Sequence, residues 1–203
     1  MDLERVEREL KKRLSYQYKW GRKQSNSWDY DTNFIYQTYS FASLLRKTKD
    51  FTQELQNYAL NRWYNFWSAM AAEDIFTSHS NIIANKNVYD KLVDFTIDTI
   101  SFDHKTSVFP KGFQKSYQYA IQNEKELIQW LYENQSQQSR KHLENRLFVI
   151  MYDIDNQHWK MKAEIMQLKT KIDQYVENFS IKNLHQFDFG RGIVYSDIVW
   201  VTK

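Results

Sequence analysis

The chain has 203 residues, which is enough for one domain with a sizeable hydrophobic core. Its 17% aromatic content argues against disorder, and a single Pro with four Gly leaves little material for an internal linker. The absence of Cys excludes disulfides, a cysteine nucleophile and thiolate-bound zinc. A formal net charge of +3 permits a polyanionic partner without requiring one.

From residues 1–5 we expect no signal peptide at the start of the chain. Residues 1–5 are mostly charged and lack the apolar run of a signal peptide. No stretch approaches the roughly 18 to 20 uninterrupted apolar residues that cross a bilayer. We therefore expect no membrane association and a cytoplasmic location.

Helical spacing of apolar residues dominates the first part of the chain. It predicts a surface helix over residues 2–14, a short helix over about 33–47 and a longer helix over 51–76. The apolar stripe of the first helix consists of Leu3, Val6, Leu10 and Leu14. The stripe of the longest helix predicts that it lies against the core.

The pattern then changes to alternation with period two. Residues 91–97 and 100–109 are predicted to be strands, with a further short strand near Val88 and Tyr89. The remaining predicted elements are a helix over 115–134, a buried strand over 146–152, a helix over 157–179 and strands around 193–195 and 198–201. Together they predict a mixed α/β fold, in which helices flank a small central mixed sheet and a helical region precedes it.

The two alternating segments are expected to form a hairpin with a tight turn at residues 98–99. In that register Phe95 faces Phe102 and Asp94 lies opposite Asp103. A slip of one residue would move the two acids apart, so the prediction depends on the register.

Lys105 projects from the same face as Asp103, two residues further along the strand. Two carboxylates held as close as Asp94 and Asp103 repel each other, and a Mg²⁺ or Mn²⁺ ion would compensate through hard oxygen ligands. A lysine beside such an ion can position a water molecule and balance charge on a phosphate. These three residues therefore predict a site for phosphodiester hydrolysis. The alternative is a solvated hairpin face on which Lys105 neutralises Asp103.

The segment Val93-Asp94 followed by Asp103-His104-Lys105 resembles the PD-(D/E)XK motif of the restriction-endonuclease-like nuclease superfamily. The order of helix, hairpin, helix and buried strand over residues 51–153 is similar to that of the superfamily core. Val93 stands where the motif has Pro, and Asp103 takes the place often held by Glu. The resemblance implies a metal-dependent nuclease core at 51–153, with a helical extension at 1–50 and a C-terminal helix and strands at 154–203, all in a single domain.

By the same resemblance, Asp94 and Asp103 would bind Mg²⁺ or Mn²⁺, and Lys105 would orient the attacking water. The helix before the hairpin often carries a further Glu in the superfamily. Glu73 matches that position and is the expected third metal ligand, although its neighbour Asp74 competes for the role.

Other residues have weaker assignments. Lys111, just after the second strand, and Arg191, between two glycines, are candidate phosphate contacts, or simply turn residues. His104 is expected to point away from Asp103 and to pack in the core, and His79 is a candidate neighbour of Glu73.

The expected function is metal-dependent hydrolysis of nucleic acid, with DNA as the expected substrate. The alternatives are a catalytically inactive nuclease-like protein that binds nucleic acid, and a helical interaction module that uses the N-terminal part. The sequence leaves a homodimer open as the assembly.

Overall fold

The computed structural model describes residues 1–20, 26–87, 92–134, 143–190 and 192–203. The strand expected near Val88 and Tyr89 and the candidate phosphate contact Arg191 lie outside these residues. The chain divides into two compact units. We call Met1–Ala71 with Lys162–Met166 the helical unit, and Ala72–Met161 with Gln167–Lys203 the sheet unit.

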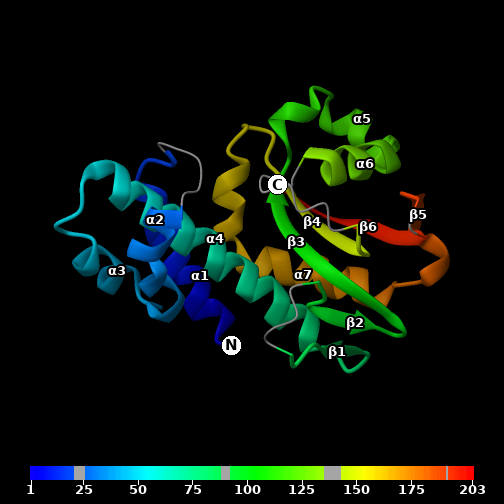
Figure 1. The fold of residues 1–203 in the computed structure, drawn as a ribbon, viewed down its shortest axis with the longest axis horizontal. Helices are drawn as coiled ribbons and strands as arrows, with labels where there is room; N and C mark the ends of the chain where they lie inside the picture. The colour runs from blue at the N-terminus through cyan, green and yellow to red at the C-terminus, as the bar shows by residue number, and fades with distance from the viewer. Residues whose placement is uncertain (21–25, 88–91, 135–142, 191) are drawn as a thin grey trace. The chain divides into compact units, whose positions relative to one another are not determined.

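The helical unit is built from helices near the N-terminus, drawn blue to cyan in Figure 1. Its elements are α1 (Leu3–Lys12), η1 (Arg13–Ser15), α2 (Asn26–Asp31), η2 (Asn33–Gln37), α3 (Phe41–Lys47) and most of α4 (Gln53–Thr77). Asp2 caps α1 by accepting a hydrogen bond from the backbone N–H of Arg5 at 2.9 Å. Val6 and Leu10 are buried, as the apolar stripe predicts.

The predicted helix over 33–47 is in fact two elements. The 3-10 turn η2 ends at Gln37, and α3 begins after Ser40, whose hydroxyl accepts a hydrogen bond from the N–H of Ser43. The carbonyl of Thr38, between the two elements, accepts from the indole N–H of the buried Trp63 at 2.6 Å. A side-chain cap and a long-range hydrogen bond therefore end the helical run that local spacing predicted.

The sheet unit contains an open mixed sheet whose strands, within the described residues, have the order β1-β2-β3-β4-β6-β5. The strands are β1 (Ile82–Ala84), β2 (Phe95–Ile97), β3 (Ile100–Val108), β4 (Arg146–Tyr152), β5 (His185–Asp188) and β6 (Ile193–Thr202). The first three are antiparallel neighbours, β3, β4 and β6 run parallel, and β5 is antiparallel to β6. The predicted mixed α/β class is confirmed.

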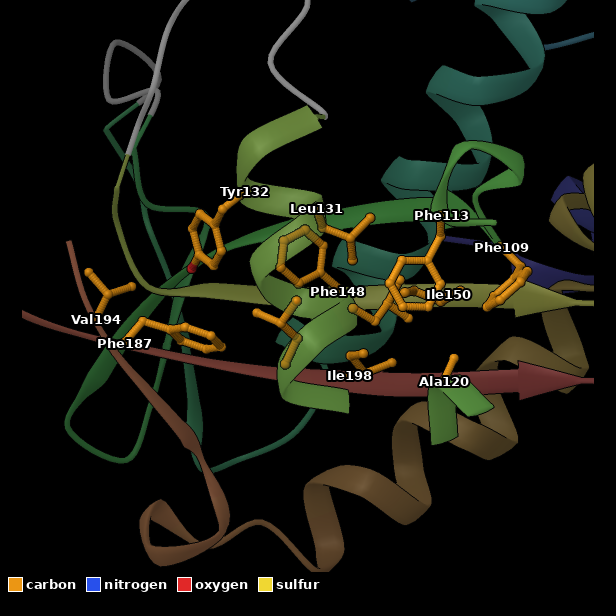
Figure 2. Close-up of a cluster of buried hydrophobic side chains, with 12 residues drawn as sticks. Phe109, Phe113, Ala120, Leu131, Tyr132, Phe148, Ile150, Phe187, Val194 and Ile198 are labelled. Carbon is orange, nitrogen blue, oxygen red and sulfur yellow. The ribbon is translucent and has the colours of Figure 1, made fainter. Parts of the chain in front are cut away.

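Helices cover both faces of this sheet (Figure 1). They include α5 (Tyr117–Gln122), α6 (Glu124–Asn134) and α7 (Ile165–Glu177). The chain also forms the 3-10 turns η3 (Lys111–Phe113), η4 (His158–Ala163) and η5 (Ile181–Asn183). Figure 2 shows side chains of α5 and α6, among them Ala120 and Leu131, packed on Phe148 and Ile150 of β4 and Ile198 of β6. On the other face Phe76 of α4 stacks on Phe95 of β2.

Several boundaries differ from the prediction. The expected helix over 115–134 is interrupted at Asn123, which ends α5 and whose carbonyl accepts from the N–H of Glu126 at the start of α6. The expected helix over 157–179 begins as the 3-10 turn η4 before α7. The two C-terminal strands are one strand, β6, and the edge strands β1 and β5 were not predicted. Both are short, so alternation within them is too brief to detect.

No helix in the described part of the chain combines the length and apolarity needed to cross a membrane.

Candidate metal centre

The hairpin of β2 and β3 has the predicted register where Phe95 faces Phe102 and Ile97 faces Ile100, but the strand pairing does not extend to the predicted pair of Asp94 with Asp103. The ladder ends at Phe95, because the N–H of Asp94 donates to the carbonyl of Phe102 at 2.8 Å. The next donor on β3, the N–H of His104, is taken by the Asp94 carboxylate at 2.8 Å. The Asp94 side chain thus replaces a backbone acceptor and is directed to His104.

Glu73, Asp94 and His104 form the central cluster of the candidate centre. Each offers one ligand atom, and these atoms all lie within 4.8 Å of one another. Glu73 comes from the last part of α4, Asp94 from the residue before β2, and His104 from β3. The ring Nδ1 of His104 lies 2.7 Å from Asp94 Oδ2. Two carboxylates and one imidazole at this spacing can hold a divalent cation.

The two carboxyl groups of the cluster differ in their affinity for protons. Burial raises the pKa of Glu73, and the nearby charge of Asp94 raises it further, against the opposing influence of His104. Burial also acts to raise the pKa of Asp94, but hydrogen bonds from His104 and the charge of Lys105 outweigh it and lower that pKa. Asp94 is therefore the more readily ionised ligand, and Glu73 is the group whose charge most needs a neighbouring cation.

His104 is packed as the sequence predicts. Its side chain stacks on Phe95 with ring centroids 5.8 Å apart, and it is only 8% exposed. Among the described residues its Nε2 has no hydrogen-bond partner, and neither does the buried Oγ1 of Thr106. These two residues share a face of β3, because side chains two apart on a strand point the same way. Buried polar atoms without partners are rare and commonly mark a bound water or ion.

Asp103 lies in a different environment from Asp94. It is 4% exposed, and its Oδ1 and Oδ2 accept from Lys105 Nζ at 2.5 Å and from Arg146 Nε at 3.1 Å. Arg146, on the adjacent parallel strand β4, also lies over the ring of Tyr132. Both oxygens of Asp103 are thus occupied by cations of the protein itself, and within the described residues it belongs to neither cluster of three candidate metal ligands.

The structure therefore brings together Glu73 and Asp94, and separately Asp103 and Lys105. The charge of Lys105 still reaches Asp94, whose pKa it lowers. Lys111 is exposed in η3, beyond the end of β3. Asp74 is partly buried beside Glu73.

The second histidine considered, His79, is paired elsewhere. Its Nε2 lies 3.0 Å from Asp173 Oδ1, on α7.

Sequence reasoning missed two features of the sheet unit. It assigned His104 to the core alone, although an imidazole next to a paired acid is also a metal ligand. It also missed a second cluster, formed by Glu124 of α6, His185 of β5 and Asp197 of β6. These three residues come from separate elements, and no local spacing signals that they meet.

Comparison of the chain with protein-family models, with curated proteins and with solved structures finds no match. The geometry of the clusters is thus the basis for a functional assignment.

Proposed function

We propose that this protein hydrolyses phosphodiester bonds of nucleic acid with the help of a divalent cation, and that DNA is its substrate. The observation that carries the proposal is the cluster of Glu73, Asp94 and His104, whose ligand atoms lie within 4.8 Å of one another. Carboxylate oxygens suit Mg²⁺ and Mn²⁺, and both ions commonly keep open positions for water and for a phosphate oxygen.

The arrangement of the sheet unit supports this proposal at the level of the fold. Helix α4 is followed by the antiparallel strands β1, β2 and β3, then by α5 and α6, and then by β4, which is parallel to β3. The resemblance to PD-(D/E)XK nucleases implies the order helix, hairpin, helix and buried strand, and these elements follow that order with one additional strand, β1, and with the second helix divided into α5 and α6. A fold does not specify an activity, so the side chains must carry the chemical argument.

The side chains supply complementary parts of a hydrolytic site. A bound divalent cation would lower the pKa of a coordinated water and polarise a phosphate oxygen. Asp94 is held ionised by His104 and Lys105. The Lys105 side chain is 44% exposed and its charge lowers the pKa of Asp94, so it can attract a phosphate group electrostatically, and Lys111 offers a second exposed amine beyond β3.

The experiment measures cleavage of labelled single- and double-stranded DNA, and of RNA, with Mg²⁺, with Mn²⁺ and with a chelator. We expect metal-dependent cleavage of DNA that Asp94→Asn abolishes and that Lys105→Gln lowers by about 100-fold or more. Asp98→Asn, at the exposed turn of the same hairpin, and Lys182→Gln, exposed in η5, are the matched controls and should cleave normally. Equal cleavage by Asp94→Asn and the wild type would refute the proposal.

One observation favours a second candidate, a nucleic-acid-binding protein without catalysis. Asp103 is already neutralised by Lys105 and Arg146, so the acid of the (D/E)-x-Lys motif is not free to bind a metal ion. This candidate predicts DNA binding whose affinity falls with salt, with no cleavage under any metal condition. The same cleavage assay, combined with a binding titration at several salt concentrations, separates the two candidates.

A further inference from the structure

We infer that the cluster of Glu73, Asp94 and His104 is a mixed nitrogen and oxygen site that selects Mn²⁺ over Mg²⁺, with His104 Nε2 as its nitrogen ligand. The inference rests on the cation site of the proposed function and specifies which ion that site takes. It does not depend on whether the protein cleaves nucleic acid.

The orientation of the imidazole is the first step. Asp94 Oδ2 lies 2.7 Å from His104 Nδ1 and also accepts the His104 backbone N–H at 2.8 Å. These two contacts hold the ring at Nδ1. A neutral ring that carries its hydrogen on Nδ1 presents a lone pair on Nε2. Metal-binding histidines usually have this arrangement, in which one ring nitrogen donates to a carboxylate and the other binds the metal.

The surroundings of Nε2 are the second step. His104 is more than nine-tenths buried, and its Nε2 has no hydrogen-bond partner among the described residues. The buried Oγ1 of Thr106, on the same face of β3, also has none. A buried imidazole nitrogen without a partner is costly, and a bound ion would satisfy it. The hydroxyl of Thr106 can then contact the ion or a water molecule that the ion holds.

The donor set decides which ion fits. Mg²⁺ strongly prefers oxygen ligands in a regular octahedron, whereas imidazole nitrogen binds first-row transition metals. Glu73 supplies a carboxylate oxygen that Mn²⁺ accepts, Asp94 holds the imidazole from the Nδ1 side, and Nε2 adds a nitrogen ligand that Mg²⁺ disfavours. The site should therefore prefer Mn²⁺ by about tenfold or more.

The second cluster provides an internal control. Its polar atoms already have protein partners: Trp200 Nε1 donates to Glu124 Oε1 at 2.6 Å, Tyr175 Oη donates to Asp197 Oδ2 at 2.9 Å, and His185 Nε2 lies 3.3 Å from Glu124 Oε2. We therefore assign the ion to His104 and not to His185.

The test uses the full chain and MnCl₂ or MgCl₂ as the probes. Calorimetric titration with each ion gives the two affinities. Pulsed electron paramagnetic resonance of bound Mn²⁺ detects nitrogen coupling from an imidazole ligand, and labelling the histidines with ¹⁵N identifies that nitrogen in the wild type. We expect tighter binding of Mn²⁺ and a histidine nitrogen coupled to it.

Two variants locate the nitrogen. In His104→Asn the amide N–H₂ can take the place of Nδ1 beside Asp94, but nothing takes the place of Nε2. This variant should lose the nitrogen coupling and about tenfold in Mn²⁺ affinity, while Mg²⁺ affinity changes little. His185→Gln should keep the nitrogen coupling and the Mn²⁺ affinity of the wild type. Circular dichroism tests whether each variant is folded. If His104→Asn is unfolded, the ¹⁵N-labelled wild type still shows whether a histidine nitrogen binds the Mn²⁺ ion.

Three results would overturn the inference: equal affinity for both ions, Mn²⁺ bound without histidine nitrogen, or loss of the coupling in His185→Gln alone. The first two would leave the proposed hydrolysis standing if DNA is still cleaved. Conversely, selective Mn²⁺ binding through His104 without any cleavage would refute the hydrolase and keep the metal site.

Discussion

Replacing Asp103 with Asn should destabilise the sheet unit rather than only remove a charge from a catalytic site. Asp103 is 4% exposed and Arg146 is 6% exposed, and the Arg146 Nε lies 3.1 Å from Asp103 Oδ2. Removing one partner of a buried ion pair typically costs about 3 to 5 kcal/mol, because the other charge stays buried without compensation. The contact with Lys105, whose side chain is 44% exposed, adds about 1 kcal/mol at most.

That loss is large for a protein whose free energy of unfolding is expected to be about 5 to 15 kcal/mol. Urea denaturation at pH 7, followed by tryptophan fluorescence and circular dichroism, measures it directly. Lys105→Gln is the control and should cost about 1 kcal/mol or less. The double variant Asp103→Leu with Arg146→Met should recover most of the stability, because it removes both charges and leaves apolar side chains of similar size.

A loss of less than about 1 kcal/mol in Asp103→Asn would refute this reasoning. It would mean that the pair with Arg146 is not a buried, mutually compensating one, and Asp103 would then be available as a metal ligand. If the loss is as large as expected, inactivity of an Asp103 variant reports unfolding, and Asp94 and Lys105 are the residues with which to test catalysis.

Three further predictions concern the free energy of unfolding. Burial lowers the pKa of Lys162 to about 8, so the unfolded chain binds more protons than the folded chain between pH 8 and 10.5. Lys162→Met should therefore stabilise the folded protein by about 3 kcal/mol at pH 7. Urea titrations should show this gain shrinking by about 2 kcal/mol at pH 9.5. Burial raises the pKa of Glu73, so the contribution of Glu73 to stability falls as pH rises above 4.5. Glu73→Gln should therefore raise the melting temperature at pH 7 while weakening Mn²⁺ binding. A lowered melting temperature would contradict this. In Gly112→Ala the new Cβ would lie 2.9 Å from Trp130 Cζ2. This close contact should lower the free energy of unfolding, measured in urea, by about 1 to 3 kcal/mol. An unchanged urea midpoint would show that Trp130 moves aside freely.

Much of the sheet unit follows from local pattern. Alternation over residues 91–97 and 100–109 predicted the hairpin, and the register was confirmed over the shorter strand β2, because a slip of one residue would turn Phe95 and Phe102 to the other face. The apolar run from Arg146 to Tyr152 specified a central buried strand with the observed bounds. The short edge strands β1 and β5 and the break at Asn123 were not predicted from local pattern, since they depend on partners elsewhere in the chain.

The candidate site also combines features that local sequence predicts with features that only the fold decides. From the sequence we predicted that Asp94 lies opposite Asp103 with Lys105 on the same face, and the family resemblance added Glu73. Which charges meet was decided by tertiary structure. The ladder stops at Phe95, so Asp94 is directed to His104. Arg146, 43 residues from Asp103 along the chain, lies beside it only because β4 pairs in parallel with β3. Periodicity is a property of neighbouring residues, whereas the pairing of buried charges depends on which strands become neighbours when the chain folds.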